Sequence, residues 1–433
     1  MKFICDNINT NGEGHLTFAG LDTVALAKEY GTPLYILDTD KIRQMCRLYI
    51  SSLKKHFGEN VLPLYASKAL SFVGIYRILK EENMGIDVVS AGEIYTALKA
   101  GYPAENMYFH GNYKTDDEIR FAIDNGVGCF IVDNLSELEV IDEYCARIGK
   151  KQKVMMRLSP GIDPHTFKAV VTGNVDSKFG FAIETRQAES ATIEFLGKKN
   201  IDFCGYHCHI GSQIFDSIPF YDAAKIMTQF IADMQRKYGF VTRELNLGGG
   251  IGVRYVGAHP ELDIDEILGE IAGHVRNTCA EAGIDIPKIL IEPGRSIVAD
   301  SGMTLYTAGA LKEITGYKKY LPIDGGMSDN PRFALYQAEY TVYNASRMNE
   351  SADVVCDVVG KCCESGDIIQ ENVTISAPQK GDIIAVCTTG AYNYSMASNY
   401  NKIPRPPIVG ISGGKAEILV KRESFSDLSV NEL

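Results

Sequence analysis

The stretch VLPLYASK, residues 61–68, is a short apolar run that ends in a polar residue, and seven further stretches repeat this design. They are GIDVVS (85–90), NMYFHG (106–111), GCFIVDN (128–134), KVMMRLS (153–159), FCGYHCHIGS (203–212), ELNLGGG (244–250) and KILIEPG (288–294). Helical stretches separate these runs, and strands that alternate with helices predict a parallel sheet. Eight such units favour an α/β fold of the (β/α)8 TIM-barrel type. An open, doubly wound sheet is the alternative, but it does not need functional residues after every strand.

The rest of the chain has a different character. Beyond about residue 300 it is rich in β-forming residues and turns, as in ENVTISAPQKGDIIAV (371–386), and this predicts a C-terminal antiparallel β-sandwich or barrel domain. The N-terminal stretches GHLTFAG and TPLYILD do not fit the barrel count, and we expect them to join that β domain. The predicted domains are therefore a barrel at 36–299 and a β domain made of 1–35 and 300–433.

Composition excludes several classes of partner. The 433 residues carry a net charge of −12, which argues against binding to nucleic acid or to an anionic membrane surface. We therefore expect a small-molecule substrate. The eleven cysteines are an odd number, and the opening MKFICDNINT has no signal-peptide pattern, so we expect reduced thiols and a cytoplasmic protein. No run of eighteen apolar residues is present, and a membrane span is not expected.

Polar residues or glycines stand at the C-terminal ends of the eight predicted strands. They are Lys68, Asp87, His110, Asp133, Arg157, His209, the glycines 248–250 and Glu292. A (β/α)8 barrel collects its active site at these strand ends, so the residues are predicted to converge on one mouth. Lys68 has small and apolar neighbours, which predict a buried amine whose charged form is disfavoured, a nucleophile suited to Schiff-base formation. A lysine that extends to solvent at a helix start is the alternative.

Glycines and hydroxyls near the same mouth indicate a phosphate. In LNLGGGIGV a strand turns into a helix, where backbone N–H groups can bind phosphate oxygens. Ser212 in HIGSQ, with Gly294 and Arg295 in EPGR, adds further donors. A phosphate site beside an amine-binding lysine suggests pyridoxal phosphate, with Glu292 as the partner of its ring nitrogen.

A zinc site in CGYHCHIGS is the competing interpretation. In a strand, His207 and His209 point to one side and Cys208 to the other, whereas a tetrahedral site needs all its ligands on one side. We therefore expect no metal. His209 is expected to lie over a flat cofactor ring, and Cys204 and Cys208 to pack as small hydrophobic residues.

Several motifs in one order resemble a known family. YASKAL, HCHIGSQ, GGG, EPGRSIVADSG, CESGD and GAY, with GIDVVSAGE, HGNYK, DSKFGF and DGGMSDNPRFALY, make the chain similar to diaminopimelate decarboxylases, in the alanine-racemase-like class of pyridoxal-phosphate enzymes. The resemblance covers nearly the whole chain. It implies a barrel with a β domain that includes the N-terminal segment, and a head-to-tail homodimer whose active sites are shared across the interface.

The resemblance also implies a role for each matching residue. Lys68 would carry the cofactor, His209 would stack on its ring, Glu292 would pair with its nitrogen, and Cys363 would be the proton donor that reaches across the dimer. The residues implied to contact the cofactor are Lys68, Asp87, His209, Ser212, Gly248, Gly249, Gly250, Glu292, Pro293, Gly294, Arg295 and Tyr392. Those implied to contact the substrate are Arg295, Arg332, Tyr336, Glu364 and Tyr392.

These roles imply the reaction. Two arginines suit a distal carboxylate and Glu364 suits a distal amine, which together describe meso-2,6-diaminopimelate, decarboxylated to L-lysine and CO2 in the last step of lysine biosynthesis. Decarboxylases of D-ornithine, D-lysine, arginine or carboxynorspermidine are the nearest alternatives, followed by an alanine racemase and by a catalytically inactive relative that only binds a partner. Leu70 and Tyr113 depart from the commoner asparagines of the family, and Cys362 is expected to be a core residue of the β domain.

Overall fold

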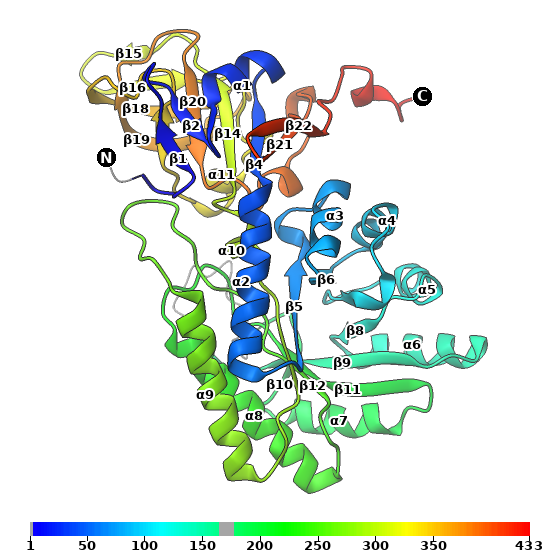
Figure 1. Cartoon of the computed structure of the whole chain (residues 1–433). Coiled ribbons are helices and arrows are strands. Elements are labelled where there is room, and N and C mark those ends of the chain that lie inside the picture. Colours follow the sequence, from blue (N-terminus) through cyan, green and yellow to red (C-terminus); the bar gives the residue numbers. More distant parts are fainter. Residues whose placement is uncertain (1–2, 164–176) are drawn as a thin grey trace. The chain divides into compact units, whose positions relative to one another are not determined.

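The computed structural model describes residues 3–163 and 177–433, and the chain forms two compact units (Figure 1). The β unit comprises Met1–Gln44, Val253–Glu261 and Arg295–Leu433. The barrel unit comprises Met45–Gly252 and Leu262–Gly294. The domain boundaries at 36 and 299 stay a prediction. Among the described residues, no helix has both the length and the apolar character needed to cross a bilayer.

Eight parallel strands close into a barrel, which confirms the predicted fold. Their order is β9–β11–β12–β13–β5–β6–β7–β8, and β8 pairs back to β9. The strands are β5 (Val61–Ala66), β6 (Gly85–Val88), β7 (Met107–Phe109), β8 (Cys129–Val132), β9 (Gln152–Ser159), β11 (Ile201–Cys208), β12 (Glu244–Asn246) and β13 (Lys288–Ile291). Each strand lies within one of the eight stretches identified in the sequence or begins a residue or two before it. A short strand, β10 (Phe181–Ala182), adds to the edge of β9 and was not anticipated.

Helices alternate with the barrel strands, and the first of them precedes β5. They are α2 (Thr39–Phe57), α3 (Val73–Glu81), α4 (Ala91–Lys99), α5 (Asp116–Asp124), α6 (Leu135–Ile148), α7 (Gln187–Gly197), α8 (Ile218–Tyr238) and α9 (Ile264–Ala282). Local signals explain their ends. Thr115 and Glu118 form a capping box at the start of α5, and Gly239 ends α8 in a left-handed conformation with φ 66°.

The barrel interior is filled by side chains from its strands. A buried cluster joins Leu64, Tyr108, Cys129, Ile131, Met155, Cys204 and Leu290. Cys204 and Cys208 are both buried, as expected for cysteines that pack as small hydrophobic residues. The barrel is therefore a packed core, and its chemistry is confined to the strand ends.

Three sheets build the β unit. The first is β1 (Ile8–Thr10), β2 (Leu16–Phe18) and β3 (Leu21–Asp22). The second has the order β17 (Val342–Asn344), β20 (Ile383–Cys387), β14 (Gly302–Thr307), β4 (Leu34–Asp38), β21 (Ile408–Ser412) and β22 (Lys415–Val420). The third has the order β15 (Lys312–Ile314), β16 (Lys318–Pro322), β18 (Ala352–Val359) and β19 (Ile368–Ser376). Helices α1 (Thr23–Tyr30), α10 (Arg295–Val298) and α11 (Arg332–Tyr336) complete the unit.

The N-terminal segment belongs to the β unit, as expected. Strand β4 lies between β14 and β21, so blue and red parts of the chain meet in one sheet (Figure 1). Leu16, Phe18 and Ile36 share a core cluster with Met303 and Val409. The pairing is antiparallel except between β4 and β21 and between β16 and β18, which run parallel. The predicted antiparallel β domain is confirmed, and the two parallel pairs arise where distant segments enter the sheets.

Candidate active site

Lys68 follows β5 in a single 3-10 turn, Ser67–Ala69. Its neighbours Ser67 and Ala69 are buried, and the Tyr65 hydroxyl donates a hydrogen bond to the carbonyl of Leu70 at 3.0 Å, which fixes the turn. Lys68 itself is exposed, so the expectation of a buried amine is wrong. The reason is local: the strand has ended, and the turn leaves this one side chain accessible to solvent, while its charge still acts on Asp87 and His209.

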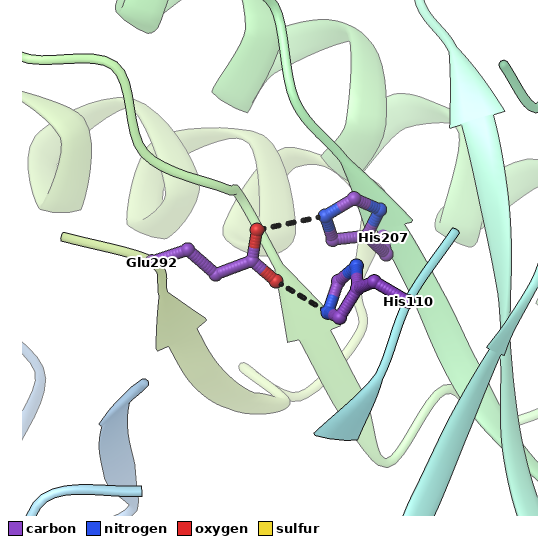
Figure 2. A group of neighbouring side chains, drawn as sticks. All are labelled: His110, His207 and Glu292. Atoms are coloured by element: carbon purple, nitrogen blue, oxygen red, sulfur yellow. Dashed lines mark hydrogen bonds and ion pairs between the residues drawn. The ribbon is translucent and has the colours of Figure 1, made fainter. Parts of the chain in front are cut away.

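Glu292, directly after β13, lies at the centre of a buried polar cluster (Figure 2). The His207 ring and the Glu292 Oε2 atom are hydrogen-bonded through Nε2 at 3.1 Å, and Asn246 donates from Nδ2 to Oε1 at 2.7 Å. His110 Nε2 lies 3.0 Å from the same Oε1 atom. The register explains the arrangement, since His207 pairs with Asn246 and Asn246 pairs with Leu290, two residues before Glu292.

The surroundings shift the pKa values of two carboxyl groups in the cluster, Glu292 and Asp87, in opposite directions. Burial alone would raise the pKa of Glu292, yet His110 and His207 hold this pKa well below its usual range. Burial raises the pKa of Asp87, at the end of β6, even though His110 and Lys68 act in the opposite direction. Burial also lowers the pKa of His207 to about 4. Glu292 is therefore the ionised carboxylate of the site, and His207 is a neutral imidazole.

His209 and the glycine loop are built around each other. The Gly249 N–H donates to His209 Nδ1 at 3.2 Å, and the Gly248 N–H donates to Asn246 Oδ1 at 2.9 Å. Burial and the Lys68 charge hold the pKa of His209 well below its usual value, so its ring is neutral. These two glycines thus orient side chains of the site. Of the three loop glycines, Gly250 is the one whose N–H donates to no acceptor within the described residues.

The glycines are required because the backbone passes very close to neighbouring strands. A Cβ atom at Gly249 would collide with the carbonyl oxygen of Glu292, and one at Gly250 with the carbonyl oxygen of Gly211. At Gly294 a Cβ would lie 2.8 Å from the Cβ of Ala66. Pro293 accepts a hydrogen bond from the Ala66 N–H at 3.1 Å, which joins the ends of β13 and β5.

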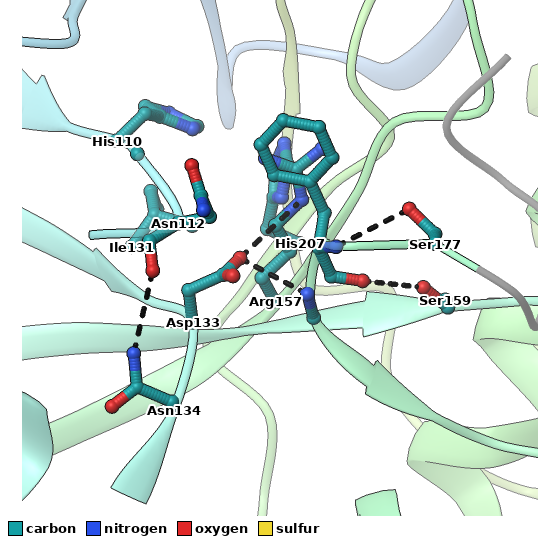
Figure 3. Close-up of polar contacts among 12 residues, drawn as sticks. His110, Asn112, Ile131, Asp133, Asn134, Arg157, Ser159, Ser177 and His207 are labelled. Atoms are coloured by element: carbon teal, nitrogen blue, oxygen red, sulfur yellow. Dashed lines mark hydrogen bonds and ion pairs between the residues drawn. The ribbon is translucent and has the colours of Figure 1, made fainter. Parts of the chain in front are cut away.

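Arg157 lies in a second group of contacts on the barrel unit (Figure 3). Its Nε atom is 3.8 Å from Asp133 Oδ1, and its guanidinium carbon is 4.1 Å from the centre of the Phe179 ring. The Gly180 N–H donates to Asp133 at 3.0 Å, and the Ser159 hydroxyl donates to the Phe179 carbonyl at 2.7 Å. These contacts anchor the motif DSKFGF, of which Asp176 lies outside the described residues.

Ser212, a predicted phosphate contact, is partly buried after β11.

Two buried arginines form a separate cluster in the β unit. Arg295 donates to the Tyr255 hydroxyl at 2.8 Å, and Arg332 donates to the Tyr340 hydroxyl at 3.0 Å. The Tyr392 ring centre lies 4.6 Å from the Arg295 guanidinium carbon. Burial alone would raise the pKa of Tyr255, but both arginines lower it below its ordinary value. The tyrosines therefore hold two positive charges in a buried position.

Tyr336 ends α11 and is only partly buried. Among the described residues, Tyr336 and Arg332 form no hydrogen bond or ring contact with each other, although both lie on the same short helix. Its predicted role in substrate binding stays a prediction.

Leu70 is buried and Tyr113 is exposed, so the two departures from the family pattern lie in different environments.

The loop 360–367 presents Cys363 and Glu364 to solvent. Buried Asp367 holds this loop, because its carboxylate accepts hydrogen bonds from the N–H groups of Cys362 and Met327 at 2.7 and 2.6 Å. The Tyr400 hydroxyl donates to Glu364. Cys362 is buried, as expected for a core cysteine.

Comparisons with known proteins agree with this geometry. Residues 40–299 match the family model described as the pyridoxal-binding domain of pyridoxal-dependent decarboxylases. The chain belongs to this class of enzymes. It is 43% identical to the diaminopimelate decarboxylase of Bacillus subtilis over 98% of this chain and 97% of that protein, and 40% identical to that of Staphylococcus aureus over 98% and 99%.

A solved structure supports the same family assignment. The M. jannaschii diaminopimelate decarboxylase, in complex with L-lysine, superposes with a TM-score of 0.91 at 31% identity, over 100% of this chain and 99% of that one. Within the pyridoxal-dependent decarboxylases, the chain therefore belongs to the diaminopimelate decarboxylase family, and its cofactor is pyridoxal phosphate.

The residues of the barrel unit fit this cofactor. An ionised carboxylate has about four acceptor positions, and the three nitrogen atoms beside Glu292 leave one for a ring N–H. The glycine loop leaves no room for side chains where the backbone must approach a phosphate.

Sequence reasoning missed several residues of the two clusters. Asn246, Tyr255 and Tyr340 were not singled out, although Asn246 stands two residues before the glycine loop. His110 and Arg157 were noted only as strand-end residues, and His207 only as a possible zinc ligand. No periodic signal marks Tyr255, which lies in an irregular segment.

Proposed function

We propose that this chain decarboxylates meso-2,6-diaminopimelate to L-lysine and CO2, with Lys68, Glu292 and His209 serving the cofactor and Cys363 serving as proton donor. The observation that carries the choice of substrate is the arginine cluster of the β unit. Arg332 is buried against Tyr255 and Tyr340 and forms no ion pair with an acidic side chain in the described part of the chain. A substrate carboxylate would neutralise this buried charge.

Each residue has a defined task in the proposed reaction. When bound, pyridoxal phosphate withdraws electrons from the carbon that loses its carboxylate. Glu292 would accept a hydrogen bond from the ring N–H, the neutral His209 ring would pack against the cofactor, and Ser212, Gly250 and Gly294 would hold its phosphate. The carboxylate leaves as CO2, and the Cys363 thiol delivers a proton to the same carbon.

The distal end of the substrate selects the reaction. Arg295 and Arg332 bind the distal carboxylate, and Glu364 binds the distal ammonium. A substrate that lacks the distal carboxylate would leave a buried guanidinium without a counter-charge, which costs affinity. This reasoning separates diaminopimelate from ornithine, lysine and arginine.

The test is product analysis with competing substrates. Purified protein with pyridoxal phosphate is offered meso-diaminopimelate, D-ornithine, D-lysine, L-lysine and L-arginine in parallel, and CO2 and the amine product are measured. Release of L-lysine from diaminopimelate alone is the expected result. Preference for a substrate without a distal carboxylate would overturn the proposal.

We also propose a homodimer with shared sites, in the cytoplasm. The exposed Cys363 and Glu364 suit a role in a partner's site, and all eleven cysteines are free thiols, as in a reducing compartment. Mixing a Lys68→Ala chain with a Cys363→Ala chain tests the sharing. Mixed dimers are expected to regain one intact site. If no activity returns although mixed dimers are recovered, the sites are not shared.

A further inference from the structure

Two histidines face Glu292 from different parts of the barrel (Figure 2). His207 belongs to β11, while His110 follows β7, and β5 and β6 lie between β7 and β13 in the sheet order. The two rings meet edge to face with centres 4.8 Å apart, and both are buried. Their Nε2 atoms contact different oxygens of the same carboxylate, at 3.1 Å for His207 and 3.0 Å for His110.

We propose that His110 and His207 are positioning residues that hold Glu292 as an oriented carboxylate and thereby keep the pyridine nitrogen of the bound cofactor protonated. The proposal rests on the proposed function in one respect, that Glu292 is the partner of this nitrogen. The added element is the role of His110 and His207, which act through Glu292 and contact neither the ring nitrogen nor the substrate.

The tautomer of His207 follows from its surroundings. A carboxylate only accepts hydrogen bonds, so the Nε2 atom that faces Glu292 must carry a proton. Burial lowers the pKa of His207 to about 4, so this is the single ring proton of a neutral imidazole at neutral pH. His207 therefore donates to Glu292 without adding a positive charge.

The charges around the cluster favour the same state. The other ionisable groups that act on it include Asp87, Arg157, Lys68, His209, Cys208, Asp133 and Glu93. Two neighbouring carboxylates repel each other, so ionising both costs free energy. Burial raises the pKa of Asp87, while the histidines lower the pKa of Glu292. A proton taken up by the pair therefore goes to Asp87 before Glu292, which leaves Glu292 as the acceptor for a ring N–H.

Strand geometry makes the orientation rigid. His207 lies inside β11, and Asn246 in the adjacent β12 pairs with it in register and donates to the Oε1 atom of Glu292. The backbone N–H of His110 donates a hydrogen bond to the Val88 carbonyl at 2.8 Å, which ties this residue to β6. A group on rigid strands holds its partner within a narrow range of positions, which a side chain on a loop would not.

The experiment reads the protonation of the cofactor directly. Holoenzyme is prepared with pyridoxal phosphate labelled with ¹⁵N in the ring, without substrate, and the ¹⁵N chemical shift is followed from about pH 6 to 9. The wild-type signal is expected to stay that of a protonated nitrogen throughout. His207→Ala and His110→Ala are expected to lower the apparent pKa of the nitrogen by at least one unit, a tenfold loss of proton affinity.

A conservative variant and a control separate positioning from damage to the fold. His207→Gln keeps an N–H donor and is expected to restore most of the wild-type titration. His274→Ala, which removes a ring stacked on Tyr221, is expected to leave the titration unchanged. The Ala variants should also lower kcat by about tenfold, with a smaller change in KM.

Two results would overturn the inference. A wild-type nitrogen that is unprotonated at neutral pH refutes it without any variant, which covers the case in which the Ala variants fail to fold. Ala variants that bind the cofactor and titrate like the wild type refute it as well. Failure of the proposed function looks different, because the wild-type protein would then bind no labelled cofactor or release no L-lysine.

Discussion

At the scale of single residues, aromatic hydroxyls and imidazoles contact the charged groups of the Glu292 cluster and of the arginine cluster. Glu292 is held by His110 and His207, and Arg295 by the Tyr255 hydroxyl. A neutral partner, such as the His207 ring, keeps a buried charge in position while leaving it available to a ligand, whereas a fixed counter-ion would neutralise it.

Tyr255→Phe removes the acceptor of the Arg295 hydrogen bond without removing the ring. We expect KM for diaminopimelate to rise by roughly 10- to 150-fold, since one hydrogen bond to a charged group is worth about 1.5–3 kcal/mol, with a smaller effect on kcat. Steady-state kinetics measure the change. Tyr221→Phe, outside both clusters, is the matched control, and an unchanged KM in Tyr255→Phe would contradict the assigned role.

Asp329 gives the β unit a pH-dependent stability. Burial raises the pKa of Asp329 to about 7, whereas an unfolded aspartate titrates near about 3.9. Between these values the folded state binds more protons than the unfolded state, so the free energy of unfolding falls as pH rises through this window.

Asp329→Asn should remove this component of the pH dependence. The expected flattening is about 2 kcal/mol between roughly pH 5 and 7, at about 1.4 kcal/mol per unit. Urea unfolding midpoints at several pH values measure it, with exposed Asp353→Asn as the control. An Asn variant with the wild-type slope would show that Asp329 does not carry the effect.

At the scale of elements, the predictable part of the site is the part that strands impose. The ends of β5, β6, β11, β12 and β13 could be located from apolar runs and their polar ends, because burial and chain reversal both leave marks in the sequence. The exposure of Lys68 and the location of Tyr255 could not, because both depend on how an irregular segment turns. The parallel pairs β4–β21 and β16–β18 depend on long-range register, which local pattern does not encode.

The glycine loop after β12 should tolerate no side chain at position 249. Gly249→Ala would push a methyl group against the Glu292 carbonyl, so we expect cofactor binding to weaken by at least about tenfold, which corresponds to about 1.4 kcal/mol. Fluorescence titration of the apoprotein with pyridoxal phosphate measures it. Gly273→Ala in α9 is the control, since a Cβ there meets nothing within 4 Å. Equal affinities in the two variants would refute the close-approach explanation.

At the scale of the whole molecule, the β unit is assembled from both ends of the chain. Deleting residues 1–38 removes β4 from the middle of its sheet and leaves β14 and β21 with unpaired edges. We expect the truncated chain to aggregate, as measured by size-exclusion chromatography. Deleting residues 424–433, which are mostly exposed and follow the last strand, should leave a soluble protein. A monodisperse protein after the first deletion would mean that β4 is dispensable.

Because β4 lies between β14 and β21, its sheet can form only after most of the chain has been synthesised. Its neighbours β14 and β21 begin at residues 302 and 408, so a ribosome that has completed β4 must still add hundreds of residues before the sheet can close. At about 5–20 residues per second this takes roughly 20–70 s. The eight barrel strands emerge within that interval and can fold first. Until β14 emerges, β4 is an apolar strand without a partner, and until β21 emerges one of its edges stays unpaired, which makes it a natural substrate for chaperones that bind nascent chains.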